Sequence, residues 1–311
     1  MSYGLTLAAL LAACLLDRCL GESRRWHPLV GFGQLAQWVE STLNRDASCP
    51  VGFFATLLLL VPPTALAFWL QQTLPKADVW GLAVYWLLSC IGLYLALGWR
   101  SLTLHVRAVS DALAEKDLPL ARAKVGLIVS RDCRAASELE VRRAAMESAL
   151  ENTSDAIVAP LFWFLVAGLP GVILYRLSNT LDAMWGYKNT RFKTFGWAAA
   201  RWDDLLNWVP ARLTALGFVL CGNARSGWRA WRKQAGLCES PNAGPVMCAG
   251  AGALGVRLGG PAVYGGEVKQ KPWMGDGADP VDEDVERAFK LIAKCVGFWL
   301  FLAVLGLLLV R

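Results

Sequence analysis

The chain has 311 residues, of which 55% are hydrophobic and only 18% are charged, and its mean hydropathy is +0.39. This composition is too apolar for an ordinary soluble domain of that length, so the chain is interpreted as an integral membrane protein. The formal net charge of +6 is dispersed among acidic residues. In a membrane protein such an excess reports topology more often than nucleic-acid binding, and no nucleic-acid partner is expected.

The nine cysteines are scattered without a CxxC pair, and several lie in apolar runs. They are interpreted as small buried hydrophobes in a reducing setting. With two histidines and no cysteine cluster, a zinc site is not expected. Any metal should therefore have oxygen ligands, with magnesium as the first choice.

Apolar segments predict an all-α, polytopic integral membrane protein with about four to five membrane segments, treated as a single domain over 1–311. The first segment is shorter than the roughly 20 residues that span a bilayer and is interpreted as a retained membrane helix. The second and third are long enough to span and form a hairpin. The segments are 3–16, 51–70, 79–98, 156–175 and 289–310.

Basic residues flank the hairpin, whereas its tip carries only Lys76. The positive-inside rule therefore places 17–50 and 99–155 in the cytoplasm. We expect a multi-pass protein of the cell inner membrane whose site faces the cytoplasm. The loop with Arg24, Arg25 and His27 can bind an anion, although a solvated basic flank, with a histidine that satisfies a turn, is an equal interpretation.

Residues 99–155 are predicted to form a cytoplasmic helical insert, because their later part is rich in strong helix formers. If its last helix continues far enough, Glu147, Glu151 and Asp155 fall at i, i+4 and i+8 and point from one face. A line of three negative charges is a poor core and a good cation site.

The segment 156–175 contains Gly168 and Pro170, which break or kink a helix, and an interrupted segment at membrane depth usually lines a cavity. A single crossing would place its two polar flanks on opposite faces of the membrane. We therefore favour a broken, re-entrant segment with both flanks in the cytoplasm. Polar residues from 179 to 212 are interleaved with tryptophans, and this density beside an apolar segment indicates a site.

Several long motifs occur in an order that resembles the integral-membrane adenosylcobinamide-phosphate synthases of cobalamin biosynthesis, the CobD/CbiB type. They are LDRCLGESRRWHP, ESALENTSDAIVAPLFW, NTLDAMWGYKN, FGWAAARWDDLLNWVPARLTA, SPNAG, GALGVRLGGP and YGG. One departure is that Pro245 and Val246 follow SPNAG, where the family usually has a Trp-Pro pair and a Met-rich stretch. A literal GxGxxG at Gly250 is discounted because no strand precedes it, and no Walker motif occurs.

The resemblance implies an ATP-dependent carbon-nitrogen ligase. Its reaction joins adenosylcobyric acid, a cobalt-containing corrinoid, to the amine of aminopropanol phosphate. ATP and Mg²⁺ are the expected cofactors, and membrane lipid and other corrinoid-pathway enzymes are candidate partners. Two alternatives stay open: a non-catalytic membrane sensor of the related β-lactamase-induction family, and a corrinoid transporter that uses the broken 156–175 segment.

Activating a carboxylate by phosphoryl transfer needs a metal ion, cationic side chains and a base. The candidate metal ligands are Glu147, Glu151 and Asp155, with Asp182 and either Asp203 or Asp204 as alternates. The candidate catalytic residues are Glu151, Asp155, Asp182 and Lys188. The candidate substrate- and phosphate-binding residues are His27, Asn152, Asn179, Asn189, Arg191, Lys193, Arg201, Asp204 and Arg212.

Overall fold

The computed structural model describes residues 3–22, 27–46, 48–264 and 266–309. Arg24 and Arg25 of the expected anion-binding loop lie outside these residues. Whereas the sequence analysis treats the chain as one domain, its contacts form two compact units. Unit 1 comprises Met1–Gly98, Ala159–Asn207 and Val304–Arg311, and unit 2 comprises Trp99–Val158 and Trp208–Ala303.

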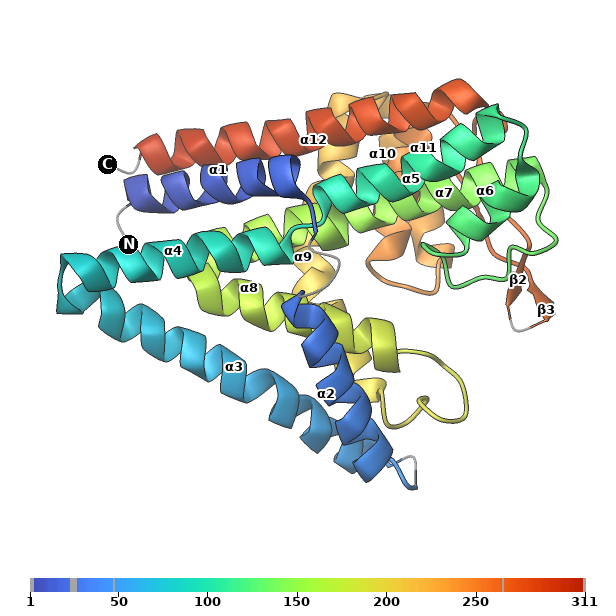
Figure 1. Ribbon diagram of the computed structural model, residues 1–311. Helices are drawn as coiled ribbons and strands as arrows, with labels where there is room; N and C mark the ends of the chain where they lie inside the picture. Colours follow the sequence, from blue (N-terminus) through green and yellow to red (C-terminus); the bar gives the residue numbers. More distant parts are fainter. Residues whose placement is uncertain (1–2, 23–26, 47, 265, 310–311) are drawn as a thin grey trace. The chain divides into compact units, whose positions relative to one another are not determined.

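Unit 1 is built from helices (Figure 1). Helix α4 packs against α1, α3 and α8, and α2 packs against α3 and α8. The turn between α3 and α4 is closed by Asp78, whose carboxylate accepts the N–H of Gly81 at 2.7 Å. The helices of unit 1 are α1 (Tyr3–Leu20), α2 (Pro28–Leu43), α3 (Cys49–Ala77), α4 (Val79–Ala96), α8 (Ala159–Trp185) and the first part of α9 (Trp197–Cys221).

Five helical stretches of the described chain are long and apolar enough to cross a membrane. They coincide with the five apolar segments expected from the sequence, and the all-α, polytopic membrane fold is confirmed. The stretches are Tyr3–Leu20, Cys49–Ala77, Val79–Ala114, Glu138–Trp185 and Asp282–Leu309.

Helix α8 is broken at Gly168, whose φ of 65° and ψ of −148° are not helical. Only glycine adopts this region readily, and Pro170 cannot donate a backbone hydrogen bond. On either side of the break, Trp163 and Tyr175 belong to one packed cluster, and the Trp163 indole donates to the Leu206 carbonyl at 3.0 Å. The two halves of α8 therefore fold back on each other.

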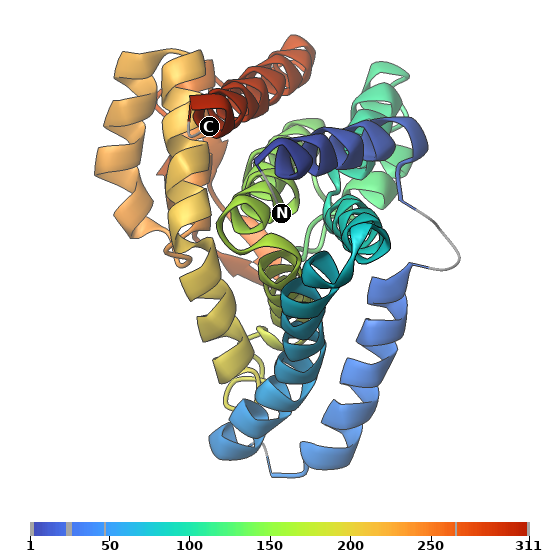
Figure 2. The ribbon, with the colours of Figure 1, turned by 90° about the vertical axis from the view of Figure 1, so that its left-hand side faces the viewer.

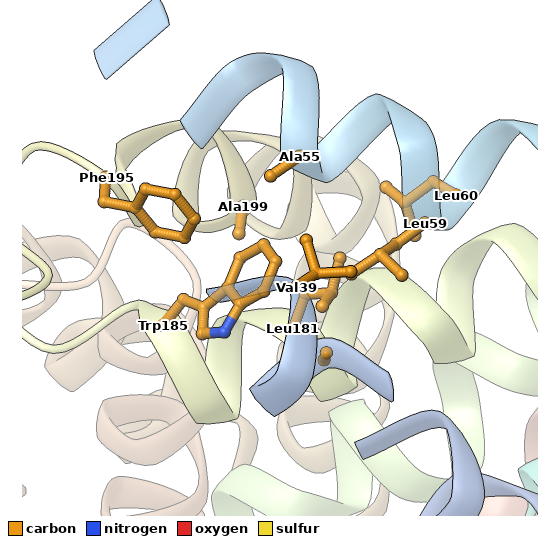
Figure 3. Packing of buried hydrophobic residues seen from close by; sticks show 9 residues of the cluster. Val39, Ala55, Leu59, Leu60, Leu181, Trp185, Phe195 and Ala199 are labelled. Atoms are coloured by element: carbon orange, nitrogen blue, oxygen red, sulfur yellow. The ribbon is translucent and has the colours of Figure 1, made fainter. Parts of the chain in front are cut away.

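The apolar core of unit 1 joins α2, α3, α8 and α9 (Figure 3). Trp185 and Phe195 meet edge to face, with their ring centroids 5.1 Å apart. The chain comes so close here that a Cβ at Gly52 would lie 1.9 Å from the Phe195 carbonyl oxygen. This packing fixes the end of α8 against the start of α9, where several of the candidate polar residues lie.

Unit 2 contains α5 (Trp99–Ala114), α6 (Leu118–Val125) and α7 (Glu138–Thr153), then a π-helical turn at Ser154–Val158. It continues with α10 (Ala224–Gln234), a 3₁₀ turn (Ala235–Leu237), α11 (Ala243–Leu254) and most of α12 (Asp282–Leu309). Helices α10 and α11 lie side by side (Figures 1 and 2). Glycines allow their close approach, since a Cβ at Gly252 would lie 2.9 Å from the Gly227 Cα.

In the described part of the chain, four short strands that the sequence analysis did not predict follow α11. Strand β1 (Leu258–Gly259) pairs antiparallel with β4 (Trp273–Met274). Strands β2 (Ala262–Tyr264) and β3 (Glu267–Lys269) pair with each other as an antiparallel ribbon. Each is too short to show an alternating pattern of apolar and polar residues, so periodicity could not predict it.

Contacts in unit 2 restrict the membrane topology. The Glu147 carboxylate on α7 accepts the backbone N–H of Gly259 at 2.8 Å. Residues 147 and 259 must therefore lie on the same side of any membrane, and the chain between them crosses it an even number of times or not at all. A segment that turns back at Gly168 satisfies this requirement, while its re-entrant placement in a bilayer stays a prediction.

Replacing Gly168 with alanine should destabilise the protein by about 1 to 3 kcal/mol, because its φ and ψ are accessible to glycine only. A Cβ would also lie 2.6 Å from the Gln71 side-chain oxygen, which accepts a hydrogen bond from the Tyr85 hydroxyl. Thermal unfolding in detergent should show the loss. The control is Gly297→Ala in α12, where an added Cβ would meet no other atom within 4 Å. Equal melting temperatures of the two variants would contradict the account.

Candidate functional site

A cavity of about 520 Å³ lies within unit 2. Its volume is in the range of small-molecule sites in proteins. Acidic, basic and hydroxyl side chains from four separate stretches of the chain line it. They are Ile128, Val129, Ser130, Arg131, Glu147, Ser148, Glu151, Asn152, Asp155, Leu237, Cys238, Glu239, Ser240, Ala243, Met247, Tyr264, Gln270, Lys271, Pro272 and Met274.

Helix α7 brings three of the predicted metal ligands to this cavity. Its start is fixed by a capping box between Ser137 and Glu140. Its end runs into the π-helical turn, so the helix continues far enough to place Glu147, Glu151 and Asp155 on the cavity wall. Single π-helical turns of this kind occur frequently at functional sites. The expected common face is therefore present, while the metal-binding role stays a prediction.

Glu147 is already engaged by other parts of unit 2. Its carboxylate forms an ion pair with Arg131 and accepts the Gly259 N–H, and both charged side chains are about 90% buried. Buried carboxylates need such partners, because an unpaired charge there is strongly destabilising. Glu147 thus joins α7 to residue 131 on one side and to β1 on the other, and its first role is to hold the cavity together.

Glu151 and Asp155 alone match the usual protein ligands of Mg²⁺ better than Glu147, Glu151 and Asp155 together. Within the described residues, no three His, Cys, Asp or Glu side chains are arranged to hold a metal ion together. Mg²⁺ is commonly bound through one or two carboxylates, with substrate phosphates and waters as its other ligands. Two carboxylates on one cavity wall satisfy that donor set.

Asn152 follows Glu151 in the sequence, also lines the cavity, and is positioned by its own helix. Its amide nitrogen donates to the Ser148 carbonyl at 2.9 Å and to the Ser148 hydroxyl at 3.2 Å. The Ser148 hydroxyl in turn donates to the Ile128 carbonyl at 3.0 Å. This chain of hydrogen bonds fixes the Asn152 side chain in the cavity wall.

The SPNAG motif forms another part of the wall. Ser240 lines the cavity, and its hydroxyl accepts the backbone N–H of Ala243 at 3.1 Å. Arg212, predicted as a phosphate clamp, donates to the Asn242 side chain at 2.8 Å and to the Pro241 carbonyl at 3.0 Å. Arg212 therefore holds the SPNAG loop, and its guanidinium stacks over the Trp208 ring at 4.5 Å.

A second polar group lies in unit 1, between the second half of α8 and α9. The Tyr175 hydroxyl donates to Asn207 at 3.0 Å, and the Asn207 amide donates to Asp203 at 3.0 Å. Asn179 donates to the same carboxylate at 3.2 Å. Burial, and next the charge of Asp182, raises the pKa of Asp203 to about 7. Burial also raises the pKa of Asp204.

The other predicted binding residues of unit 1 have visible structural partners. His27 caps α2 by accepting the Leu29 N–H at 3.3 Å, and burial lowers its pKa. Arg191 pairs with Glu40, a buried carboxylate that the sequence analysis did not single out. Both pairings satisfy groups in or beside α2.

The remaining candidates lie near the surface of unit 1. Asn189 accepts the Phe192 N–H at 3.0 Å in a turn. Arg201 pairs with Asp204 at 3.4 Å and is 63% exposed, a geometry that contributes little stability. The Lys188 and Lys193 side chains are exposed. The predicted set is thus divided, with Glu147, Glu151, Asn152, Asp155 and Arg212 in unit 2 and the others in unit 1.

Glu147→Gln should lower the free energy of unfolding by on the order of 3 to 5 kcal/mol, because it leaves Arg131 charged, buried and unpaired. Chemical unfolding in detergent would measure this loss. Glu138→Gln, in the exposed first turn of the same helix, is the matched control, and it should unfold like the unmodified protein. Similar unfolding of Glu147→Gln and its control would show that the ion pair contributes nothing to stability.

Asp203 should make the stability of the protein depend on pH. Its raised pKa means that the folded state keeps this proton when an unfolded carboxyl, with a pKa of about 4, has lost it. Stability should therefore fall as pH rises from about 4 to 7. Asp203→Asn should flatten that slope in unfolding measurements across this window, and an unchanged slope would assign the dependence to other groups.

Comparison with known proteins agrees with the motifs. The family model described as CobD/Cbib protein matches residues 10–292. Relatives named cobalamin biosynthesis protein CobD are 54% identical in Chromobacterium violaceum and 53% identical in Stutzerimonas stutzeri, covering 94% and 96% of this chain and 93% and 97% of theirs. In Mycobacterium tuberculosis the identity is 41%, over 90% of this chain and 89% of the relative. No solved structure matches significantly. The chain belongs to the CobD/Cbib protein family and has a role in cobalamin biosynthesis.

Proposed function

We propose that this protein catalyses ATP-dependent amide-bond formation between adenosylcobyric acid and aminopropanol phosphate, giving adenosylcobinamide phosphate. One observation supports a location for this reaction in the molecule. The cavity of unit 2 is lined by Glu151, Asn152 and Asp155 of one family motif and by Ser240 of another. These motifs are far apart in the sequence and contribute to one wall.

The reactants explain why carboxylates and cations are needed together. At neutral pH the acid is an anion and the amine is protonated, so neither is reactive as found. Transfer of a phosphoryl group from ATP to the acid makes its carbonyl carbon electrophilic. A carboxylate first accepts a proton from the ammonium group, which frees the lone pair of the amine nitrogen. The nitrogen then forms the C–N bond as the C–O bond to phosphate breaks, and the second proton that it loses leaves with the phosphate. Glu151 is the proposed acceptor of the first proton.

The donor set of the cavity also suits the expected cofactor. Bound Mg²⁺ would neutralise phosphate charge during transfer. Asp155 would hold the ion together with substrate phosphates, which leaves Glu151 to act as the base, and Asn152 and Ser240 offer polar groups for substrate oxygens. In this proposal Glu147 is the residue that keeps the wall in place, because its carboxylate is already bound to Arg131 and Gly259.

We also propose that the cavity faces the cytoplasm of a cell with this protein in its inner membrane. The basic residues that flank the 51–98 hairpin support this orientation, because the positive-inside rule predicts a cytoplasmic position for 99–155. The cavity is built jointly from that insert and from 237–274 within one compact unit. ATP is available on that side.

Purified full-length protein in detergent should convert adenosylcobyric acid, aminopropanol phosphate, magnesium and ATP into adenosylcobinamide phosphate, detected by mass. Glu151→Gln should reduce the rate by about 100-fold or more if its carboxylate acts as the general base. Glu138→Gln removes the same charge from the exposed first turn of α7 and should retain activity.

Absence of product with the folded, unmodified protein would contradict the proposed reaction. Equal rates for Glu151→Gln and Glu138→Gln would remove Glu151 from the site. Product formed without ATP would show that the acid is activated in another way.

A further inference from the structure

Lys271 is a cavity residue that none of the motifs singled out. It lies between β3 and β4, with its ammonium 4.6 Å from the centre of the Tyr264 ring. It is half-buried and lines the cavity together with Tyr264. The contact with the aromatic face restricts where the long side chain can place its charge.

The cavity contains one basic side chain that is already paired and one that is not. Among the described lining residues, Arg131 and Lys271 are the basic ones, and Arg131 is bound to Glu147. No ion pair joins Lys271 to another described residue. Its charge is therefore available to a ligand, whereas that of Arg131 is taken up by the protein itself.

Lys271 faces the same space as the carboxylates of α7. The Cys238 thiol also lies on the cavity wall, where charges of both signs act on its pKa. Its hydrogen bond with the Cys248 thiol is the main influence that lowers the pKa of Cys238, and the charge of Lys271 lowers it further. The charges of Glu147 and Glu151 act on the same thiol in the opposite sense. Positive and negative groups thus meet around one small volume.

We propose that Lys271 binds the phosphate of the amine substrate, with Glu151 toward its ammonium group. This inference rests on the proposed function, since it assigns the ends of one substrate to that cavity. A small zwitterion with separated charges matches a wall that has a lysine on one side and carboxylates on the other. Among the described lining residues there are four carboxylates and two basic groups, so a nucleoside triphosphate would need bound Mg²⁺ there, whereas the single phosphate of the amine is matched by one lysine. Cavities of this size hold drug-sized molecules, so the larger corrinoid would extend beyond it.

Lys269 is the matched control for this residue. It lies two positions earlier, and its ammonium is 5.5 Å from the same Tyr264 ring. Its side chain is exposed and is not part of the cavity lining. Loss of Lys269 removes the same charge two residues away without removing a cavity group.

The test is the affinity of the purified full-length protein for aminopropanol phosphate, measured by calorimetry in detergent. Lys271→Ala should weaken binding about tenfold or more, the effect of losing a hydrogen bond to a charged group. Lys269→Ala should stay within about twofold of the unmodified protein, and Lys271→Arg should recover most of the affinity. Binding of aminopropanol, which lacks the phosphate, should be unchanged by Lys271→Ala.

Unchanged binding of aminopropanol phosphate by Lys271→Ala, or an equal loss in Lys269→Ala, would overturn the assignment. Failure of the unmodified protein to bind this amine would also overturn it. A loss of affinity in Lys271→Ala that is confined to ATP would do so too, and would identify a nucleotide site instead. A different result would refute the proposed function without refuting this assignment. An unmodified protein that binds the amine through Lys271 and forms no amide would refute the reaction and leave the phosphate subsite standing.

Discussion

The cavity depends on the carboxylate of Glu147. This single group binds Arg131, which precedes α7, and the Gly259 N–H, which belongs to β1. Because the pair is buried, losing either partner would leave a charge without compensation. The interaction therefore fixes three stretches of chain around one space. The neighbouring Glu151 and Asp155, placed one and two turns further along, reach the cavity as a consequence.

The same contact bears on how the chain meets a membrane. Glu147 precedes the broken helix α8 and Gly259 follows it, yet the two residues are in contact. If α8 crossed the membrane once, a later segment would have to cross back. The backbone at Gly168 supplies the reversal, and packing between the two halves of α8 stabilises it. Glycine is required at this point by the local backbone conformation, and the reversal that it permits agrees with the predicted re-entrant segment.

Much of this arrangement was predictable from residues that act through local geometry. Helix-length apolar runs marked the five possible membrane spans, and the i, i+4, i+8 spacing predicted that Glu147, Glu151 and Asp155 share a face. Side chains whose partners are distant in sequence were not predictable. Glu147 and Arg191 were both candidates for ligand binding, yet each is held by a partner, Arg131 and Glu40 respectively, that no spacing rule identifies. Lys271 was missed because its strands are too short to leave a periodic signal.

The central claim is that substrate binds in the cavity of unit 2 rather than at the polar group around Asp203 in unit 1. Hydrogen exchange of the purified protein, with and without aminopropanol phosphate, tests this most directly, because the two sites lie on different peptides. The account predicts slower exchange in peptides that cover 128–131, 237–247 and 264–274. Slower exchange confined to 175–207 would contradict it and would move the site to unit 1.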